Sequence, residues 1–183
     1  MSRFKSGCRR QNIMRKEKFI MFKTAQGQAT SVPDIARKIF EIIMSDTTNS
    51  YEITVGTDSQ NFDRTKMVEV IAIHKKGMGG TYFYNIEFIH LITNLKQKIN
   101  EETSRSLFIA HDLLDALEEL FMEKDMLLDD LDVSFQIHCD IGRSGKTSVL
   151  IKEVVSWVIS QGYVCLIKPD SYAASGIADK YSK

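Results

Sequence analysis

Acidic residues stand at the ends of two segments that have the residue pattern of β-strands. Asp58 follows the run 51–57, and Asp140 follows the alternating run 133–139. Every second residue of a strand shares one face, and both aspartates belong to the less apolar face of their strand. If the two strands are parallel neighbours, their carboxylates meet at one end of the sheet, where ligands usually bind in α/β proteins. For each aspartate taken alone, the alternative is an ordinary turn residue.

A third acid, Glu102, lies on the apolar stripe of the longest helical pattern, which runs from 100 to about 124. The same stripe contains Ser106, Ile109, Leu113, Leu117 and Leu120, whereas Glu101 begins a mostly charged face. A buried carboxylate is unfavourable unless a positive charge balances it. Three carboxylates from two strands and a helix form a site for a hard cation such as Mg²⁺ or Mn²⁺. The alternative for Glu102 is an acid in the first helical turn, stabilised by the helix dipole.

The stretch HCDIGRSGKTS (138–148) has some features of a phosphate-binding loop. Such a loop requires a glycine, four further residues and then Gly-Lys-Ser/Thr, but Asp140 occupies the position of the first glycine. A carboxylate there repels the phosphate that backbone N–H groups must surround. We therefore expect no nucleotide cofactor. A protein that binds ATP or GTP through Lys146 in another manner is the alternative.

The remaining reactive side chains give weaker indications. His138 shares a strand face with Asp140 and is interpreted as a hydrogen-bonded strand histidine, with proton transfer as the alternative. Three cysteines have neither metal-ligand nor disulfide-framework spacing, which is typical of reduced thiols in a cytoplasmic protein; they are Cys8, Cys139 and Cys165. We therefore expect a cytoplasmic location.

The composition indicates one globular domain. The chain has 183 residues, is 43% hydrophobic and has a formal net charge of +0, but residues 1–18 contain seven basic residues against one acid. We expect a flexible basic arm over 1–29 and a single domain over 30–183. An arm that contacts nucleic-acid phosphates is the alternative for the first segment. No apolar run approaches the ~18 residues of a membrane span, so no membrane association is expected, and the oligomeric state is not readable.

The local patterns predict a fixed order of elements. A helix begins at 31–34, where proline and an acid follow Ser31, and runs to about 44. Strands are predicted at 51–57, 67–74 and 81–90, with the glycine-rich KKGMGG between the last two typical of a hairpin turn. After the long helix come a strand at 133–139, a helix at 146–160, a strand at 163–168 and a short helix or turn at 171–181. From residue 51 the order is therefore β-β-β-α-β-α-β-α.

This order, with acids at the ends of the first and fourth strands and on the long helix, resembles the ribonuclease H fold. More specifically, four stretches resemble the YkuK-type family of ribonuclease H-like proteins: GTDSQ (56–60), NLKQKINEETS (94–104), HCDIGRSGKT (138–147) and IKPDSYAASGIADKYSK (167–183). The resemblance spans about residue 30 to the C-terminus and leaves out the basic arm. It implies an α/β, ribonuclease H-like fold with a five-stranded mixed sheet of order 3-2-1-4-5 flanked by helices.

The resemblance also implies a metal-dependent nuclease that hydrolyses phosphodiester bonds of RNA, DNA or a hybrid with two Mg²⁺ or Mn²⁺ ions. In such an enzyme Asp58 bridges both ions, Glu102 and Asp140 hold one, and a fourth acid comes from the last helix. Asp179 occupies that position, and Asp170 is its rival, although Pro-Asp-Ser is equally typical of a turn or a helix cap.

Basic residues at the same end of the predicted sheet are candidate contacts for substrate phosphates. They are Arg143, Lys146 and Lys168, and the alternative for the first two is a solvated helix start. Nucleic acid is therefore the expected partner. Because a fold does not fix a function, a non-catalytic module that binds nucleic acid or protein is the alternative to the nuclease.

Overall fold

The computed structural model describes residues 20–142, 148–173 and 176. Its strands are β1 (Phe22–Thr24), β2 (Ala29–Thr30), β3 (Tyr51–Asn61), β4 (Thr65–Lys75), β5 (Gly79–Ile89), β6 (Val133–Gly142) and β7 (Val164–Lys168). Its helices are α1 (Val32–Met44), α2 (Leu95–Met122) and α3 (Ile151–Ser160), with short 3₁₀ turns η1 (Leu128–Asp130) and η2 (Ser148–Leu150). The predicted elements between residues 31 and 168 are thus present, with shifted ends, and most of the short helix or turn predicted at 171–181 lies outside the described residues.

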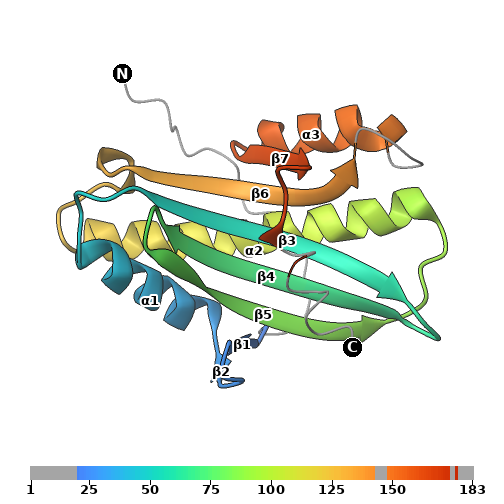
Figure 1. The fold of residues 1–183 in the computed structure, drawn as a ribbon, viewed down its shortest axis with the longest axis horizontal. Helices are drawn as coiled ribbons and strands as arrows, with labels where there is room; N and C mark the ends of the chain where they lie inside the picture. Colours follow the sequence, from blue (N-terminus) through green and yellow to red (C-terminus); the bar gives the residue numbers. More distant parts are fainter. Residues whose placement is uncertain (1–19, 143–147, 174–175, 177–183) are drawn as a thin grey trace.

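The strands form one sheet in the order β2-β1-β5-β4-β3-β6-β7 (Figure 1). β3, β4 and β5 are an antiparallel meander, whereas β6 pairs in parallel with both β3 and β7. Counted from residue 51, the last five strands have the predicted order 3-2-1-4-5. The prediction of five strands was wrong in number, because β1 and β2 extend the sheet beyond β5.

The two additional strands come from the segment before α1. Phe22 in β1 is fully buried and joins the main core, and Lys23 pairs with Tyr84 of β5. β1 therefore lies in the sheet although it falls within the segment 1–29 that we expected to be a flexible arm. Strands of three and two residues are too short for a recognisable alternation. Residues 1–19 of that segment, including Cys8, lie outside the described residues.

One face of the sheet carries the main hydrophobic core. Side chains of the central strands such as Ile53, Val55 and Ile71 pack there against α1, α2 and α3, and Figure 1 shows α2 running behind the strands. α1 begins as predicted, because the Ser31 side chain accepts the backbone N–H of Asp34 at 3.3 Å. Within the described ranges, no helix is both long and apolar enough to cross a membrane.

The opposite face carries a smaller apolar cluster. Val68, Val70 and Tyr84 pack there against Ala173, which belongs to the chain that follows β7. In Figure 1 this part of the chain crosses in front of the sheet. The C-terminal part of the described chain therefore passes over the face that carries Asp58, which pairs with Val68.

The β4–β5 turn has the glycine chemistry that the sequence indicated. Gly77 and Gly79 both have positive φ, 77° and 87°, which side-chain-bearing residues rarely adopt. At Gly80, an added Cβ would lie 2.4 Å from the Ile73 carbonyl oxygen. The hairpin therefore depends on these glycines.

Candidate active site

The two strand-end aspartates lie side by side. β3 and β6 pair in parallel through Gly56 with His138 and Thr57 with Cys139. Asp58 and Asp140 are the next residues on each strand, so the two carboxylates lie close together just beyond the paired residues, and the charge of Asp140 acts on Asp58. The expectation that these strands are parallel neighbours is therefore confirmed.

Asp140 also lies in an irregular part of β6. Cys139 pairs with Ile167 of β7, and the next pair is Gly142 with Lys168, so Asp140 and Ile141 are extra residues on β6. Bulges of this kind redirect side chains and are common beside active sites. Here the bulge brings the Asp140 carboxylate to the Lys168 side chain at the end of β7.

Glu102 approaches the same place from α2. The helix begins at Leu95, with the Asn94 side chain accepting the backbone N–H of Gln97 at 2.9 Å. Glu102 is therefore well inside the helix, and its interpretation as a first-turn acid was wrong. Its side chain is buried, as the apolar stripe predicted, and its Oε1 accepts a 2.5 Å hydrogen bond from Ser59 Oγ.

Burial and mutual repulsion raise the pKa of two of these carboxyls. Loss of hydration raises the pKa of Asp58 to about 6, and the negative charge of Asp140 adds to the rise. Burial likewise raises the pKa of Glu102 to about 8. The hydrogen bond from Ser59 lowers this pKa, and the negative charges of Asp58 and Asp140 raise it. The three acids therefore interact electrostatically although they come from three different elements.

Two lysines lie beside these acids. Lys98 Nζ donates to the Ser59 carbonyl at 2.7 Å, and its charge lowers the pKa of both Asp58 and Glu102. Lys168 Nζ lies 2.5 Å from Asp140 Oδ1, and its charge also acts on Asp58. Our sequence reading did not identify Lys98. Its position four residues before Glu102, on the same helical face, was an available indication.

A small cavity separates Glu102 from the strands. It has a volume of about 10 Å³ and is lined by Thr57, Ile99, Glu102, Thr103, Ser106, His138, Cys139, Asp140 and Ile141. This is room for about one water molecule. Glu102 and Asp140 therefore both line one small cavity between α2 and the strands β3 and β6.

His138 fixes the returning chain over the site. Its Nδ1 accepts the backbone N–H groups of Tyr172 and Ala173 at 3.2 and 3.3 Å, and burial lowers its pKa. The Tyr172 ring packs edge-on against the imidazole at 4.9 Å, and its hydroxyl donates to Glu52 at 2.8 Å. The interpretation of His138 as a hydrogen-bonded strand histidine is thus confirmed, with the neutral imidazole as acceptor.

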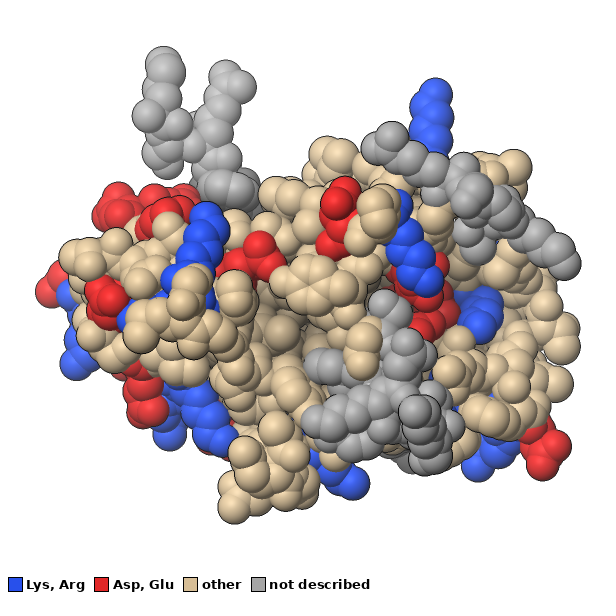
Figure 2. Space-filling model, viewed as in Figure 1, with Lys and Arg blue, Asp and Glu red and all other residues tan. Residues whose placement is uncertain are grey.

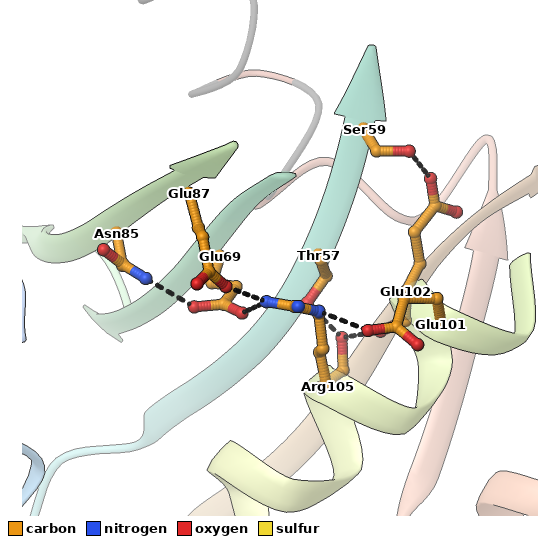
Figure 3. A network of polar contacts seen from close by, with 9 residues as sticks. Thr57, Ser59, Glu69, Asn85, Glu87, Glu101, Glu102 and Arg105 are labelled. Atoms are coloured by element: carbon orange, nitrogen blue, oxygen red, sulfur yellow. Dashed lines mark hydrogen bonds and ion pairs between the residues drawn. The ribbon is translucent and has the colours of Figure 1, made fainter. Parts of the chain in front are cut away.

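An arginine on α2 connects the helix to the sheet beside Glu102 (Figure 3). Arg105 makes 2.8 Å contacts with Glu69 of β4, Glu87 of β5 and Glu101 of its own helix. The Glu69 side chain is 1% exposed and also accepts a bond from Asn85. Arg105, which follows Glu101 on the mostly charged face of the helix, therefore reaches the sheet and holds this part of α2 in place.

The donors fit a hard divalent cation in chemistry. Carboxylate oxygens are the ligands that Mg²⁺ and Mn²⁺ prefer. Asp140 Oδ1 is shielded from solvent and makes an ion pair with Lys168 rather than a directed hydrogen bond. In the present arrangement Glu102 instead binds Ser59 and Asp140 contacts Lys168. Among the described residues, no three His, Cys, Asp or Glu side chains are close enough to surround one ion.

Several predicted site residues lie outside the described residues. These are Arg143, Lys146 and Asp179, so the expected phosphate contacts of the first two and the expected fourth acid stay predictions. The rival fourth acid, Asp170, lies exposed in the turn after β7, where its N–H bonds to the Ile167 carbonyl at 2.9 Å. Cys139 and Cys165 are free thiols, with Sγ atoms 3.8 Å apart.

The surface around the site has mixed charge. Figure 2 shows acidic and basic side chains interspersed on the face seen in Figure 1, around a largely uncharged centre. The part of this face formed by described residues thus presents no broad basic patch. Contacts with a polyanion on this face would therefore depend on individual cations beside the acids, such as Lys168.

Comparison with known proteins gives two matches. The ribonuclease H-like family model matches residues 34–183. The uncharacterized protein YkuK of Bacillus subtilis (strain 168) is 32% identical over 173 residues, which cover 91% of this chain and 99% of that protein. No solved structure matches the chain.

Proposed function

Because this chain belongs to the YkuK-type family of ribonuclease H-like proteins, we propose that it is a metal-dependent nuclease that hydrolyses phosphodiester bonds of RNA, DNA or a hybrid. The observation that carries the proposal is the pairing of β3 with β6. It brings Asp58 and Asp140 to neighbouring positions just beyond the last paired residues of β3 and β6, within strands that continue to Asn61 and Gly142. Glu102 lines the same cavity as Asp140.

The acids have the properties of cation ligands. Asp58, Glu102 and Asp140 would hold Mg²⁺ or Mn²⁺, with Asp179 as the proposed fourth ligand. The raised pKa values of Asp58 and Glu102 support this role, because a bound cation would offset the burial and the mutual repulsion that raise them. Two bound ions would supply an activated water and stabilisation of the leaving oxygen.

Other side chains of the chain would support the reaction without contacting the reacting atoms. The Arg105 network holds α2 against the sheet and so fixes the position of Glu102. His138, as a neutral acceptor, holds the backbone of Tyr172 and Ala173 in place. Lys98 keeps a positive charge between Asp58 and Glu102.

The proposal is tested by incubating the purified full chain with end-labelled RNA, DNA and RNA/DNA hybrid. We expect cleavage in Mg²⁺ or Mn²⁺, its loss in EDTA, and its loss in Asp58→Asn and Asp140→Asn. Asp115→Asn is the matched control, because that side chain is 60% exposed on the far part of α2. It should cleave like the wild type.

The outcomes separate the nuclease from its alternative. Cleavage that persists in EDTA, or in Asp58→Asn purified to the same standard, would refute the metal-dependent site. Nucleic-acid binding without any cleavage, unaffected by divalent ions, would instead support a non-catalytic binding module on this fold.

A further inference from the structure

Lys168 lies where a cation bound to Asp140 would act. Its Nζ is 2.5 Å from Asp140 Oδ1, an oxygen that is shielded from solvent and receives no directed hydrogen bond within the described residues. The contact follows from the backbone, because the irregularity in β6 places Asp140 beside the end of β7, where Lys168 pairs with Gly142. This geometry is built into the sheet and is not a chance surface contact.

The Lys168 ammonium and a divalent ion cannot both bind Asp140 Oδ1 at their usual distances. A divalent ion needs a distance of about 2.0–2.1 Å to its carboxylate ligands, and a neighbouring ammonium would repel it at close range. The wider site contains the carboxylates of Asp58, Glu102 and Asp140 beside the ammonium groups of Lys98 and Lys168. Lys168 thus supplies part of the positive charge that these acids require.

We propose that Lys168 is a built-in competitor of the divalent cation, which neutralises Asp140 when the ion is absent and is displaced when the ion binds. This inference rests on the proposed function and adds a control of metal occupancy to it. The Lys168 side chain is 49% exposed, so the displaced ammonium can move into water, where a charged lysine head is well solvated. The competition lowers the affinity of the site for its metal and keeps Asp140 paired in the metal-free protein.

The direct test measures Mn²⁺ binding to the full-length protein by the EPR signal of free Mn²⁺. Lys168→Gln should bind Mn²⁺ at least about 5-fold more tightly than the wild type, the lower end of usual coupling between sites. Lys96→Gln is the matched control. Lys96 forms an exposed 2.9 Å pair with Glu153 on the surface, so its loss removes the same charge and should leave the affinity within about twofold.

A second measurement on the wild type does not depend on the stability of a variant. Coupling is reciprocal: if the contact between Lys168 and Asp140 weakens metal binding, metal binding must weaken that contact by the same factor. Saturating Mg²⁺ should therefore increase the rate at which an amine-reactive reagent modifies Lys168, measured by mass spectrometry. The rate at Lys96 should not change.

The outcomes distinguish the two proposals. Saturable Mn²⁺ binding of equal affinity in wild type and Lys168→Gln, with unchanged labelling of Lys168, would overturn the competition and leave the nuclease proposal standing. If neither protein binds Mn²⁺, the metal-dependent function fails and the competition fails with it. Tighter binding by Lys168→Gln together with metal-dependent labelling supports both.

Discussion

Replacing Glu102 with glutamine should stabilise the metal-free protein at high pH. Burial raises the pKa of this carboxyl from 4.5 to about 8, so the folded state holds a proton that the unfolded state releases. Below pH 4.5 both states are protonated and the group has no effect on stability. As the pH rises from 4.5 to about 8 the folded wild type progressively loses stability, and above pH 8 the loss is complete.

The size of the effect follows from the same values. Each pKa unit corresponds to about 1.36 kcal/mol, so a rise from 4.5 to about 8 allows a loss of at most roughly 5 kcal/mol at pH 9. Glutamine has the same shape and keeps an oxygen that can accept the Ser59 hydroxyl. We therefore expect Glu102→Gln to exceed the wild type by about 2–5 kcal/mol at pH 9 and by less than about 1 kcal/mol at pH 5.

Urea denaturation in EDTA at pH 5, 7 and 9 measures this difference. Glu119→Gln removes a carboxylate from an exposed position of the same helix and is the matched control. Its stability should parallel that of the wild type at every pH. Parallel profiles for Glu102→Gln and the wild type between pH 5 and 9 would show that the folded protein does not raise the pKa of Glu102.

Three further predictions follow from the same structure. Arg105→Met leaves the buried Glu69 without its cation, and should lower the free energy of unfolding by about 3–5 kcal/mol in urea; a loss below about 1 kcal/mol would show that the network is dispensable. Phe22→Ala should lower the free energy of unfolding by about 3–5 kcal/mol, because Phe22 is fully buried. An unchanged value would show that β1 does not contribute to the stability of the fold. Mg²⁺ at about 100 times its Kd should raise it by about 2.7 kcal/mol in the wild type, and Asp58→Asn should remove most of that gain; equal gains in both proteins would place the ion elsewhere.

Much of the fold was predictable because its central elements are long and strongly patterned. Alternation in 133–139 and the glycine-rich turn before β5 located the strands, and the ribonuclease H-like resemblance supplied their order. β1 and β2 were missed because a two- or three-residue strand has no periodicity to recognise. The packing of Phe22 into the core is a tertiary contact that leaves no local trace.

The candidate site was predictable in its acids and in the presence of Lys168, but not in Lys98 or in the contact between Lys168 and Asp140. Asp58 and Asp140 stand out because each follows a strand pattern on its less apolar face, and Glu102 because it is an acid on an apolar helical stripe. The partner of Asp140 depends on an irregularity in β6 that shifts the register with β7. The contact of Arg105 with Glu69 was not predicted, because spacing along a helix does not show how far a long side chain reaches.

The central claim is that Asp58, Glu102 and Asp140 form one cation site, and a crystal structure of the full chain grown in Mn²⁺ tests it most directly. We expect anomalous density with the Asp58 and Asp140 carboxylate oxygens within about 2.0–2.3 Å of the ion, and the Lys168 ammonium moved away from Asp140. Anomalous density only at other positions, with Lys168 still paired to Asp140 at saturating Mn²⁺, would contradict it.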